Sequence, residues 1–376
     1  MKLLIVVNVD WFFLSHRLPV ALSALEAGYE VHLATTLTQN RESLESYGFI
    51  VHSIRVDRSD VGPIGLLALF LRLCCLFWLI RPDVVHLVTI KPVLLGGLAA
   101  RFSPIGGVVY AISGLGHVFV ASGFLGRVRR TFAGAWYRFV LGARNMRIIF
   151  QNPDDRQTIE SVAPLQPQQA IMIPGSGVDL RQYPVLPLPE KDIPVVLMAA
   201  RLLTTKGVRE FVVAAQQLRK EGIAAQFWLA GDPDPGNPAS VANDELLAWA
   251  DQGDVNVLGY RTDMAALMAQ AHIVVLPSYR EGLPKVLIEA AACGRAVVTT
   301  DVPGCRDAIV NGETGLLVPA KDAVALGNAI RQLLNDPAAC AAMGAAGRKR
   351  AEQIFDVRAV VQTHLTIYKA LLETRP

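Results

Sequence analysis

Short apolar runs alternate with longer amphipathic segments through the first half of the chain. The runs expected to form buried strands are Leu3–Val7, Glu30–Ala34, Val51–Val56 and Asp83–Val88. Between them, helices are expected at Leu18–Ala27 and Arg41–Tyr47, each closed by a glycine. This alternation predicts a parallel, doubly wound α/β sheet. Ligands of such sheets bind beyond the carboxyl ends of the strands, where the loops Asn8–Arg17 and Ser113–His117 are expected.

A second alternation follows a proline-rich break at Tyr183–Pro189, whose composition is typical of a linker. Its expected strands and helices are strands 195–199, 225–230, 255–258, 273–276 and 296–299, and helices 208–220, 264–270 and 285–292. The chain is therefore expected to form two doubly wound, Rossmann-like domains that face each other across a cleft, residues 1–183 and 184–355.

One apolar segment, Val61–Ile80, contains 20 residues and no acidic group. A membrane span needs about 20 apolar residues. Arg72 lies near the middle of the segment, however, and Gly62-Pro63-Ile64-Gly65 takes up its start, which leaves roughly 15 helical residues. A buried or a membrane-facing helix is expected here rather than a span.

Composition adds bounds on the class of protein. The chain has 376 residues, 18% of them charged, and a formal charge of +3, which is too small to indicate nucleic acid by itself. Its five cysteines have no metal-ligand spacing, and an odd number without a framework favours a reducing compartment. No signal peptide is expected, because the apolar run at the start stops at Asn8 and Asp10.

The second domain collects candidate chemistry at the ends of its strands. Arg201 follows the strand at 195–199, and Lys206 comes just before Gly207 and a helix. A helix start favours anions through its unpaired amides and its dipole. The planar guanidinium and the point charge of an ammonium suit a diphosphate, although a solvated helix start explains the same residues.

The stretch SYREGLPKVLIEAAACG places two glutamates eight residues apart, Glu281 in a turn and Glu289 inside an apolar helix. A carboxylate on an apolar helix is costly to bury unless something pairs with it. An ion pair or an exposed helix edge is one explanation for Glu289. The other is a nucleotide sugar, because carboxylates accept hydrogen bonds from ribose and sugar hydroxyls, and Gly282 allows close backbone approach.

At these residues the sequence resembles the retaining glycosyltransferases of family 4. The likeness is carried by EGLPKVLIEAAACGRAVVTTDVPGCRDAIVNGETGLLV, which holds the E-x7-E pair, and by ARLLTTKGVREFV and VNVLGYRTDM. The N-terminal segments VNVDWFFLSHRLPVALSALEAGYEVHLAT and ISGLGHVF are similar to the subgroup that acts on polyprenyl-diphosphate-linked sugars in bacterial surface polysaccharides, such as O-antigen and lipopolysaccharide.

The resemblance implies a GT-B fold and a role for each matching residue. Arg201 and Lys206 would bind the donor diphosphate and act in catalysis, and Gly259 with Tyr260 would flank the base. Glu289 would hold the ribose. Glu281, also a catalytic candidate, and the Gly282-Leu283 turn would hold the sugar. A C-terminal helix at Val357–Leu372, within residues 356–376, would cross back to the first domain. The commoner family pattern has an aromatic residue and a glycine where this chain has Leu283-Pro284, a departure that bears on the sugar.

His16 and His117 are the candidate groups of the first domain, and either could contact the acceptor or the donor phosphate. The alternative for each is a structural loop histidine. Ser15, His16 and Arg17 are placed on the acceptor side, and His117 is a catalytic candidate. In this family the leaving phosphate is thought to help deprotonate the acceptor, so no dedicated base is required. No metal or cofactor is implied, because Asp232-Pro233-Asp234 lies in a proline-rich loop rather than at a strand end.

Charge is distributed unevenly along the chain. From Val84 to Pro153 there is no Asp or Glu but eight basic residues, among them Arg127, Arg129, Arg130 and Arg138. Aromatic and aliphatic side chains interleave with these arginines, a composition typical of an interfacial helix on an anionic leaflet. A core helix with solvated arginines and a nucleic-acid contact are the alternatives, and the family favours the membrane.

The expected function is transfer of a hexose or N-acetylhexosamine from a nucleotide sugar, UDP-linked, to a lipid-linked saccharide at the inner face of the cytoplasmic membrane. The expected partners are thus the donor, the polyprenyl-diphosphate acceptor and an anionic membrane surface. A GT-B transferase with a water-soluble acceptor and a non-catalytic GT-B partner subunit are the alternatives. The oligomeric state stays open.

Overall fold

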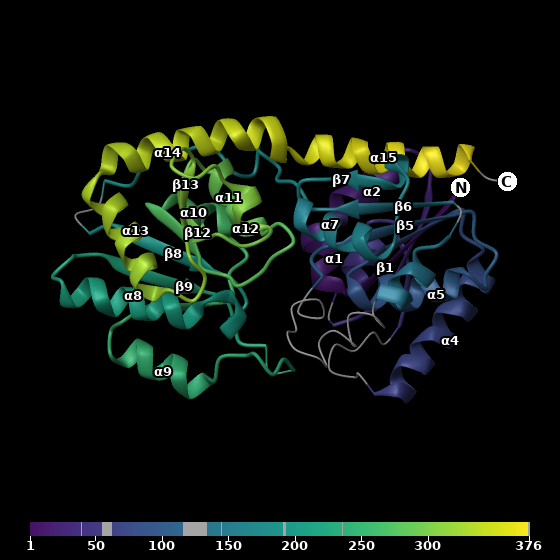
Figure 1. Ribbon diagram of the computed structural model, residues 1–376, viewed down its shortest axis with the longest axis horizontal. Helices are drawn as coiled ribbons and strands as arrows, with labels where there is room; N and C mark the ends of the chain where they lie inside the picture. Colours follow the sequence, from purple (N-terminus) through teal and green to yellow (C-terminus); the bar gives the residue numbers. More distant parts are fainter. Residues whose placement is uncertain are drawn as a thin grey trace. The chain divides into compact units, whose positions relative to one another are not determined.

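The computed structural model describes residues 1–38, 40–54, 62–115, 134–143, 145–190, 193–234 and 236–374. The chain divides into two compact units: unit 1 is Met1–Ser176 with Arg358–Pro376, and unit 2 is Gly177–Val357. Each unit contains one parallel sheet with helices around it, of seven strands in unit 1 and six in unit 2 (Figure 1). Two doubly wound α/β units are what the sequence predicts.

The sheet of unit 1 has the strand order β3-β2-β1-β4-β5-β6-β7, so the order reverses between β1 and β4. Its strands are β1 Lys2–Val9, β2 Glu30–Thr36, β3 Ile50–Ser53, β4 Val84–Val88, β5 Gly107–Ile112, β6 Met146–Phe150 and β7 Ala170–Met172. Its helices are α1 Asp10–His16, α2 Leu18–Glu26, α3 Arg41–Ser46, α4 Pro63–Ile80, the π-helix Pro92–Gly96, α5 Gly97–Ala100, residues 134–140, α7 Pro153–Val162, the 3₁₀ turn Pro167–Gln169 and α15 Val357–Glu373.

The period of two along β1 gives this sheet a core on each face. Leu3, Ile5 and Val7 face a cluster built with α1, α2 and α15. Leu4 and Val6 face the opposite cluster, which contains the inner side of α4. A continuous run of apolar residues is therefore required, because both faces of the strand are covered.

The sequence predicts a loop at Asn8–Arg17, and this prediction is wrong, because helix α1 occupies most of the segment. Asp10 is fully buried at the start of this helix. Its Oδ1 accepts the Trp11 amide at 2.7 Å, and its Oδ2 accepts the Thr38 amide at 2.7 Å. An acidic first-turn residue and these two bonds stabilise a helix too short to show an amphipathic period in the sequence.

The long apolar segment is an 18-residue helix that begins at Pro63, longer than the roughly 15 helical residues expected, because a proline is tolerated in the first turn of a helix. One side of α4 packs into the core through Leu69, Leu73 and Phe77. Within the described residues it is the one helix long and apolar enough to cross a membrane, and only 28% of this 18-residue segment is buried. The helix is thus partly exposed rather than a fully buried core helix.

The sheet of unit 2 has the order β10-β9-β8-β11-β12-β13, which reverses between β8 and β11. Its strands are β8 Val195–Ala199, β9 Gln226–Ala230, β10 Asn256–Gly259, β11 Ile273–Leu276, β12 Ala296–Thr300 and β13 Gly315–Val318. Its helical segments are the 3₁₀ turn Thr204–Lys206, α8 Val208–Lys220, α9 Asn243–Asp251, α10 Met264–Ala269, α11 Lys285–Ala292, α12 Cys305–Ala308, α13 Ala323–Asn335, α14 Pro337–Arg350 and the π-helix Ala351–Phe355.

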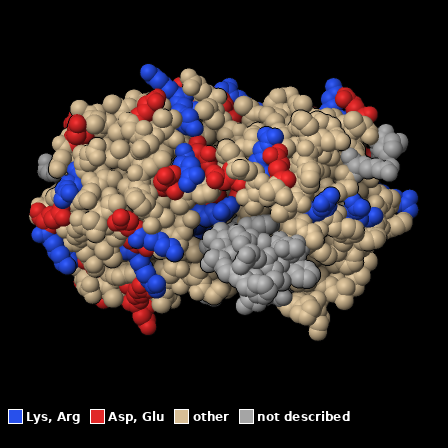
Figure 2. Space-filling model, in the orientation of Figure 1, with Lys and Arg blue, Asp and Glu red and all other residues tan. Residues whose placement is uncertain are grey.

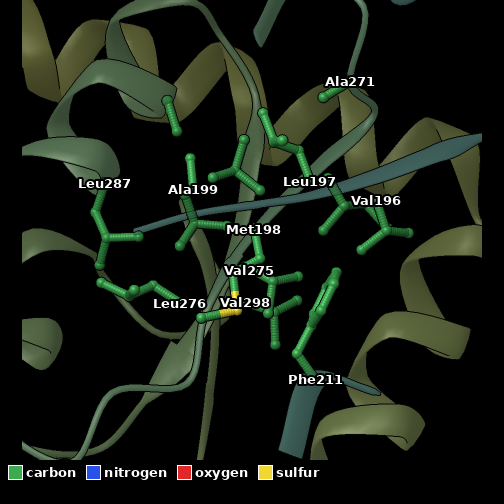
Figure 3. Packing of buried hydrophobic residues seen from close by; sticks show 14 of the residues in the cluster. Val196, Leu197, Met198, Ala199, Phe211, Ala271, Val275, Leu276, Leu287 and Val298 are labelled. Carbon is green, nitrogen blue, oxygen red and sulfur yellow. The ribbon is translucent and has the colours of Figure 1, made fainter. Parts of the chain in front are cut away.

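The core of unit 2 lies between these strands and the helices beside them. Phe211 of α8 and Leu287 of α11 belong to one buried cluster with side chains of β8, β11 and β12 (Figure 3). All four residues of β11 and all five of β8 are buried. Both strands at the point of reversal are therefore fixed on each face, and the residues that follow them start from rigid positions.

The proline-rich segment is not a free linker, because its main chain is bonded to unit 2. The Arg295 guanidinium donates to the Pro187 carbonyl at 3.2 Å, and a ring nitrogen of His272 lies 3.1 Å from the Pro189 carbonyl. Prolines lack an amide donor, but their carbonyls still accept hydrogen bonds. The division between the units falls instead at Ser176 and Gly177, a few residues before the expected boundary at 183/184.

Candidate functional site

The candidate residues of unit 2 follow strands that end at one edge of its sheet. Arg201 and Lys206 come after β8, while Glu281 and Glu289 come after β11, and these two strands are hydrogen-bonded neighbours. The sheet order reverses between them. A crevice beyond the carboxyl ends at such a reversal is where doubly wound sheets bind ligands.

Lys206 and Glu281 are joined by an ion pair between the ammonium and Oε1 of the carboxylate. The Ser278 hydroxyl donates to the same oxygen at 2.6 Å. Both charged side chains are largely shielded, with 19% of Lys206 and 12% of Glu281 exposed. Shielding from water strengthens their electrostatic effect on any group that binds beside them.

Arg201 is paired in a different way and is more open. Its guanidinium donates to Oδ2 of Asp234 at 2.8 Å, and 41% of the side chain is exposed. An exposed pair of this kind adds little stability, about 0–1 kcal/mol. The guanidinium can therefore exchange Asp234 for a phosphate at small cost, with a planar fork suited to two phosphate oxygens.

Glu289 is buried on α11, with 6% of the residue exposed. Its Oε1 accepts the Tyr183 hydroxyl at 2.6 Å and lies 3.2 Å from the Lys285 ammonium one turn earlier. Burial and the neighbouring Glu289 carboxylate raise the pKa of Tyr183, so the phenol keeps its proton as a donor. The ion pair that offered the simpler explanation of Glu289 is thus present, and the phenol is a second partner.

Two glycines bring the loops of this edge together. Gly207 has φ +77°, and a Cβ there would lie 2.1 Å from the Pro277 carbonyl oxygen. Gly304 has φ +82°, and its Cβ would lie 2.5 Å from the Gly282 carbonyl oxygen. Larger side chains would push apart the segments that carry Lys206 and Glu281, so glycine is required at both positions.

The remaining predicted donor-site residues differ in what they present. Leu283 is 8% exposed and belongs to the core of unit 2, so it can offer a ligand only its main chain. Tyr260 is 71% exposed after β10, and Gly259 has φ +64°. The Gly259 carbonyl accepts the Gly231 amide at 2.8 Å, which fixes the chain just before the aromatic ring.

In unit 1 the predicted acceptor-side residues lie at the end of α1. Ser15 is exposed and His16 is half-buried, stacked on the Phe12 ring at 4.1 Å with Nδ1 3.3 Å from the Phe12 carbonyl. Arg17 is 2% exposed, so its guanidinium does not reach the surface. The remaining predictions for this side, His117, Arg127, Arg129 and Arg130, fall outside the described residues.

Arg17 instead belongs to a buried group between β4 and α15. Burial lowers the pKa of Arg17 to about 10, although the nearby Tyr368 acts to raise this pKa. His86 Nδ1 lies 2.7 Å from the Tyr368 hydroxyl, and the rings of His86 and His364 are 5.5 Å apart. Burial and the cationic Arg17 hold the pKa of both imidazoles far down, His364 to about 3.

Three residues of the site were not found from the sequence. Ser278 stands in the quoted stretch, three residues before Glu281, and a hydroxyl so close to a candidate carboxylate was the available signal. The sequence indicates for Asp234 only a proline-rich loop, whereas in the structure it pairs with Arg201. Tyr183 gave no signal, because it reaches Glu289 across a sequence separation of 106 residues.

This fold, with a charged edge of this kind in its second sheet, defines a GT-B glycosyltransferase, and comparisons with known proteins agree. The family described as "Glycosyl transferase 4-like" matches residues 2–152, and the family described as "Glycosyl transferases group 1" matches residues 193–336. The chain belongs to glycosyltransferase family 4, whose members are retaining hexosyltransferases.

Relatives and solved structures extend over almost the whole chain. The chain is 28% identical to the N,N'-diacetylbacillosaminyl-diphospho-undecaprenol alpha-1,3-N-acetylgalactosaminyltransferase of Campylobacter jejuni, over 96% of this chain and 98% of that protein. Anabaena HepE in complex with UDP and glucose superposes with a TM-score of 0.77 at 19% identity, covering 97% and 98%. Sucrose-phosphate synthase of Thermosynechococcus elongatus gives 0.79 at 21%, covering 99% of each chain. The two structures establish the likeness of fold.

Proposed function

We propose that this enzyme transfers a hexose or an N-acetylhexosamine from a UDP-linked donor to a polyprenyl-diphosphate-linked saccharide during assembly of a surface polysaccharide. The observation that carries the proposal is that two shielded glutamates and two basic side chains follow β8 and β11, the paired strands at the reversal point of the unit 2 sheet, and that Lys206 and Glu281 form an ion pair there. A sugar nucleotide needs both kinds of group, since its hydroxyls donate hydrogen bonds and its diphosphate carries negative charge.

Each charged residue then has one task in the transfer. Arg201 and Lys206 neutralise the diphosphate, Glu289 accepts from the ribose diol, and Glu281 accepts from sugar hydroxyls. The bond between the anomeric carbon and the phosphate oxygen breaks while the acceptor oxygen bonds to the same face of that carbon. The acceptor's proton passes to the departing phosphate, so no separate base is needed. Lys206 matters most late in this step, because charge on the leaving group grows.

The lipid-linked acceptor is supported by the Campylobacter relative, which is named for its action on a diphospho-undecaprenol saccharide and which matches 96% of this chain. The UDP donor is supported by HepE, which was solved with UDP and glucose. The stretch from Val84 to Pro153, with eight basic residues and no acidic one, suits a position at the inner face of the cytoplasmic membrane.

A donor screen tests the proposal. Radiolabelled sugar nucleotides are offered to the purified enzyme with membranes that carry polyprenyl-diphosphate monosaccharides. The expected result is label in the lipid fraction with one UDP-sugar, and far less label with the Glu281→Gln variant. Label that appears only in water-soluble saccharides would contradict the lipid-linked acceptor. Transfer only from sugars linked to a nucleotide other than UDP would contradict the UDP-linked donor.

A further inference from the structure

Helix α4 presents apolar side chains to solvent along its whole length. Ile64 is 83% exposed, Leu67 57% and Leu71 52%. Trp78 follows at 54% and Leu79 at 79%. The spacing of three, four and seven residues puts Ile64, Leu67, Leu71 and Trp78 on one side of the helix, away from the buried Leu69, Leu73 and Phe77.

The chain on both sides of α4 is tied to the sheet of unit 1. Strand β3 ends at Ser53 before the helix, and β4 begins at Val84 only four residues after Ile80. The inner side of α4 also packs into the core of this unit. The helix therefore cannot leave to span a bilayer without dismantling the fold, and its outer side has to be covered in another way or remain in water.

The exposed apolar surface continues from α4 to two neighbouring segments. The Trp78 indole donates to the Phe102 carbonyl at 3.0 Å, and the Phe70 and Phe102 rings meet edge to face at 6.5 Å. The Arg101 guanidinium lies 5.2 Å from the centre of the Phe139 ring. Phe102 is 58% and Phe139 46% exposed. We call this surface the α4 face; it consists of Ile64, Leu67, Leu71, Trp78, Leu79, Phe102 and Phe139.

In residues 62–115 and 134–143, the segments that carry the α4 face, all exposed charged residues are basic. The basic rim of this face consists of four exposed arginines, Arg72, Arg81, Arg101 and Arg138. Between residues 62 and 115 the sequence has one carboxylate, Asp83, which accepts the Lys2 amide at 2.7 Å. In Figure 2 the lower right of the molecule, over α4, is tan and shows no Lys, Arg, Asp or Glu atoms. Exposed apolar side chains that form one surface, rimmed by polar residues, mark an interaction site.

We propose that the α4 face docks unit 1 onto an anionic lipid bilayer, with α4 lying in the plane of the interface and its outer side among the lipid headgroups and upper acyl chains. The inference rests on the proposed function in that the bilayer carries the acceptor. A helix in this position inserts by about 5–10 Å, and the arginines of the rim contact anionic headgroups. An indole fits the boundary layer, where one edge is apolar and the other is wet.

A second copy of the chain is a poorer occupant of the same surface. Two copies related by a twofold axis would meet through the same patch on each subunit, so each basic rim would approach its own like charges. No acidic side chain of residues 62–115 other than Asp83 exists to offset that repulsion. Anionic lipid offers both an apolar layer and the opposite charge, and it matches the two parts of the surface at once.

Vesicle binding by a triple variant, Ile64→Gln with Leu67→Gln and Leu71→Gln, tests the docking. Glutamine keeps nearly the helix propensity of leucine, and all three positions are more than half exposed, so the fold should be retained. The matched control replaces three exposed apolar residues on helices of unit 2 by glutamine, Val213, Leu247 and Val324, which are 47%, 61% and 59% exposed. Binding is measured to phosphatidylcholine vesicles with and without phosphatidylglycerol.

The unchanged enzyme should bind the anionic vesicles, the α4 variant should bind at least about ten-fold less, and the control should bind normally. UDP affinity should be equal in all three. An unchanged enzyme that stays in solution, or an α4 variant that binds as well as the control, overturns the docking. So does a dimer that the same variant converts to monomers in light scattering. Vesicle binding that depends on α4, without transfer to any lipid-linked saccharide, would leave the docking intact and overturn the proposed function.

Discussion

At the residue scale, the arrangement of Glu289 suggests that Tyr183 positions it. Both partners of the carboxylate contact Oε1, and no other described residue bonds to Oε2, so the second oxygen is available to a diol. Removing one hydrogen bond to a charged group costs about 1.5–3 kcal/mol. UDP should therefore bind about ten-fold or more tightly than 2′,3′-dideoxy-UDP, and this preference should shrink several-fold in Tyr183→Phe.

Calorimetry with the two nucleotides measures this preference. The control is Tyr110→Phe, which removes a buried phenol that donates to the Val140 carbonyl in unit 1. A loss of fold would weaken both nucleotides together and leave their ratio unchanged. Equal affinity of the unchanged enzyme for the two nucleotides would refute the ribose site. A strong preference that Tyr183→Phe retains would refute only the role of the phenol.

Lys206 should matter more for turnover than for binding. Its ammonium is shielded and paired with Glu281, so it is placed to meet charge that develops on the leaving diphosphate. In Lys206→Ala, kcat should fall on the order of 10²-fold, while donor affinity falls far less. Lys349→Ala, an exposed lysine on α14, is the control. Equal losses in kcat and donor affinity would indicate plain ground-state binding instead.

The sequence predicted the residues of the site better than their partners. Arg201, Lys206, Glu281 and Glu289 stand close to strand ends and helix starts, where local patterns are informative. Tyr183 and Asp234 meet them only after folding, because each comes from a segment far along the chain. No local periodicity indicates such a contact, and the proline-rich composition of the segment that begins at Tyr183 indicates only a linker.

At the element scale, α15 should be loosened by acid. This helix carries His364 and Tyr368 beside His86 and Arg17. The centres of the Tyr29 and Tyr368 rings are 6.1 Å apart. Both imidazoles have pKa values below the ordinary 6.5, so the folded protein keeps them neutral while the unfolded chain takes up protons. The contribution of the two neutral histidines to the free energy of unfolding is therefore complete above about pH 6.5. It is lost as the pH falls from there toward 3, by up to about 1.4 kcal/mol per pH unit for each histidine.

Hydrogen exchange at pH 7 and pH 5, corrected for intrinsic rates, tests this dependence. Amides of α15 should lose protection at the lower pH, and amides of α13 in unit 2 serve as the internal reference. His364→Phe should reduce the pH dependence, because one of the two titrating groups is gone. If α15 and α13 lose protection equally, the histidines are not what holds the helix.

Element boundaries were predictable wherever periodicity was strong. The expected bounds of β8, α8, β11 and α11 match the structure to the residue. Helix α1 was missed, because seven residues are too few to show a helical period and its start is fixed by Asp10 through Thr38, on a separate loop. The outer side of α4 has the opposite problem. Its apolar pattern is clear, but composition alone leaves open what covers it.

At the scale of the whole molecule, two doubly wound sheets follow from the alternation of strands and helices, and the family follows from motifs that span both units. The reversal point of the unit 2 sheet explains how motifs that are distant in sequence come together. Segments after β8 and after β11 become neighbours only when the strands pair. The central claim is that this edge moves a sugar from a nucleotide to a lipid-linked saccharide with its configuration retained.

The most direct test is to determine the anomeric configuration of the product by NMR, after the enzyme has acted on an α-linked UDP-sugar and a short-chain polyprenyl-diphosphate saccharide. We expect one new α-glycosidic linkage for each UDP released, and far less product with Glu281→Gln. A β-linked product would contradict retention. Release of UDP without extension of the lipid-linked saccharide, with every donor tried, would contradict the proposed transfer itself.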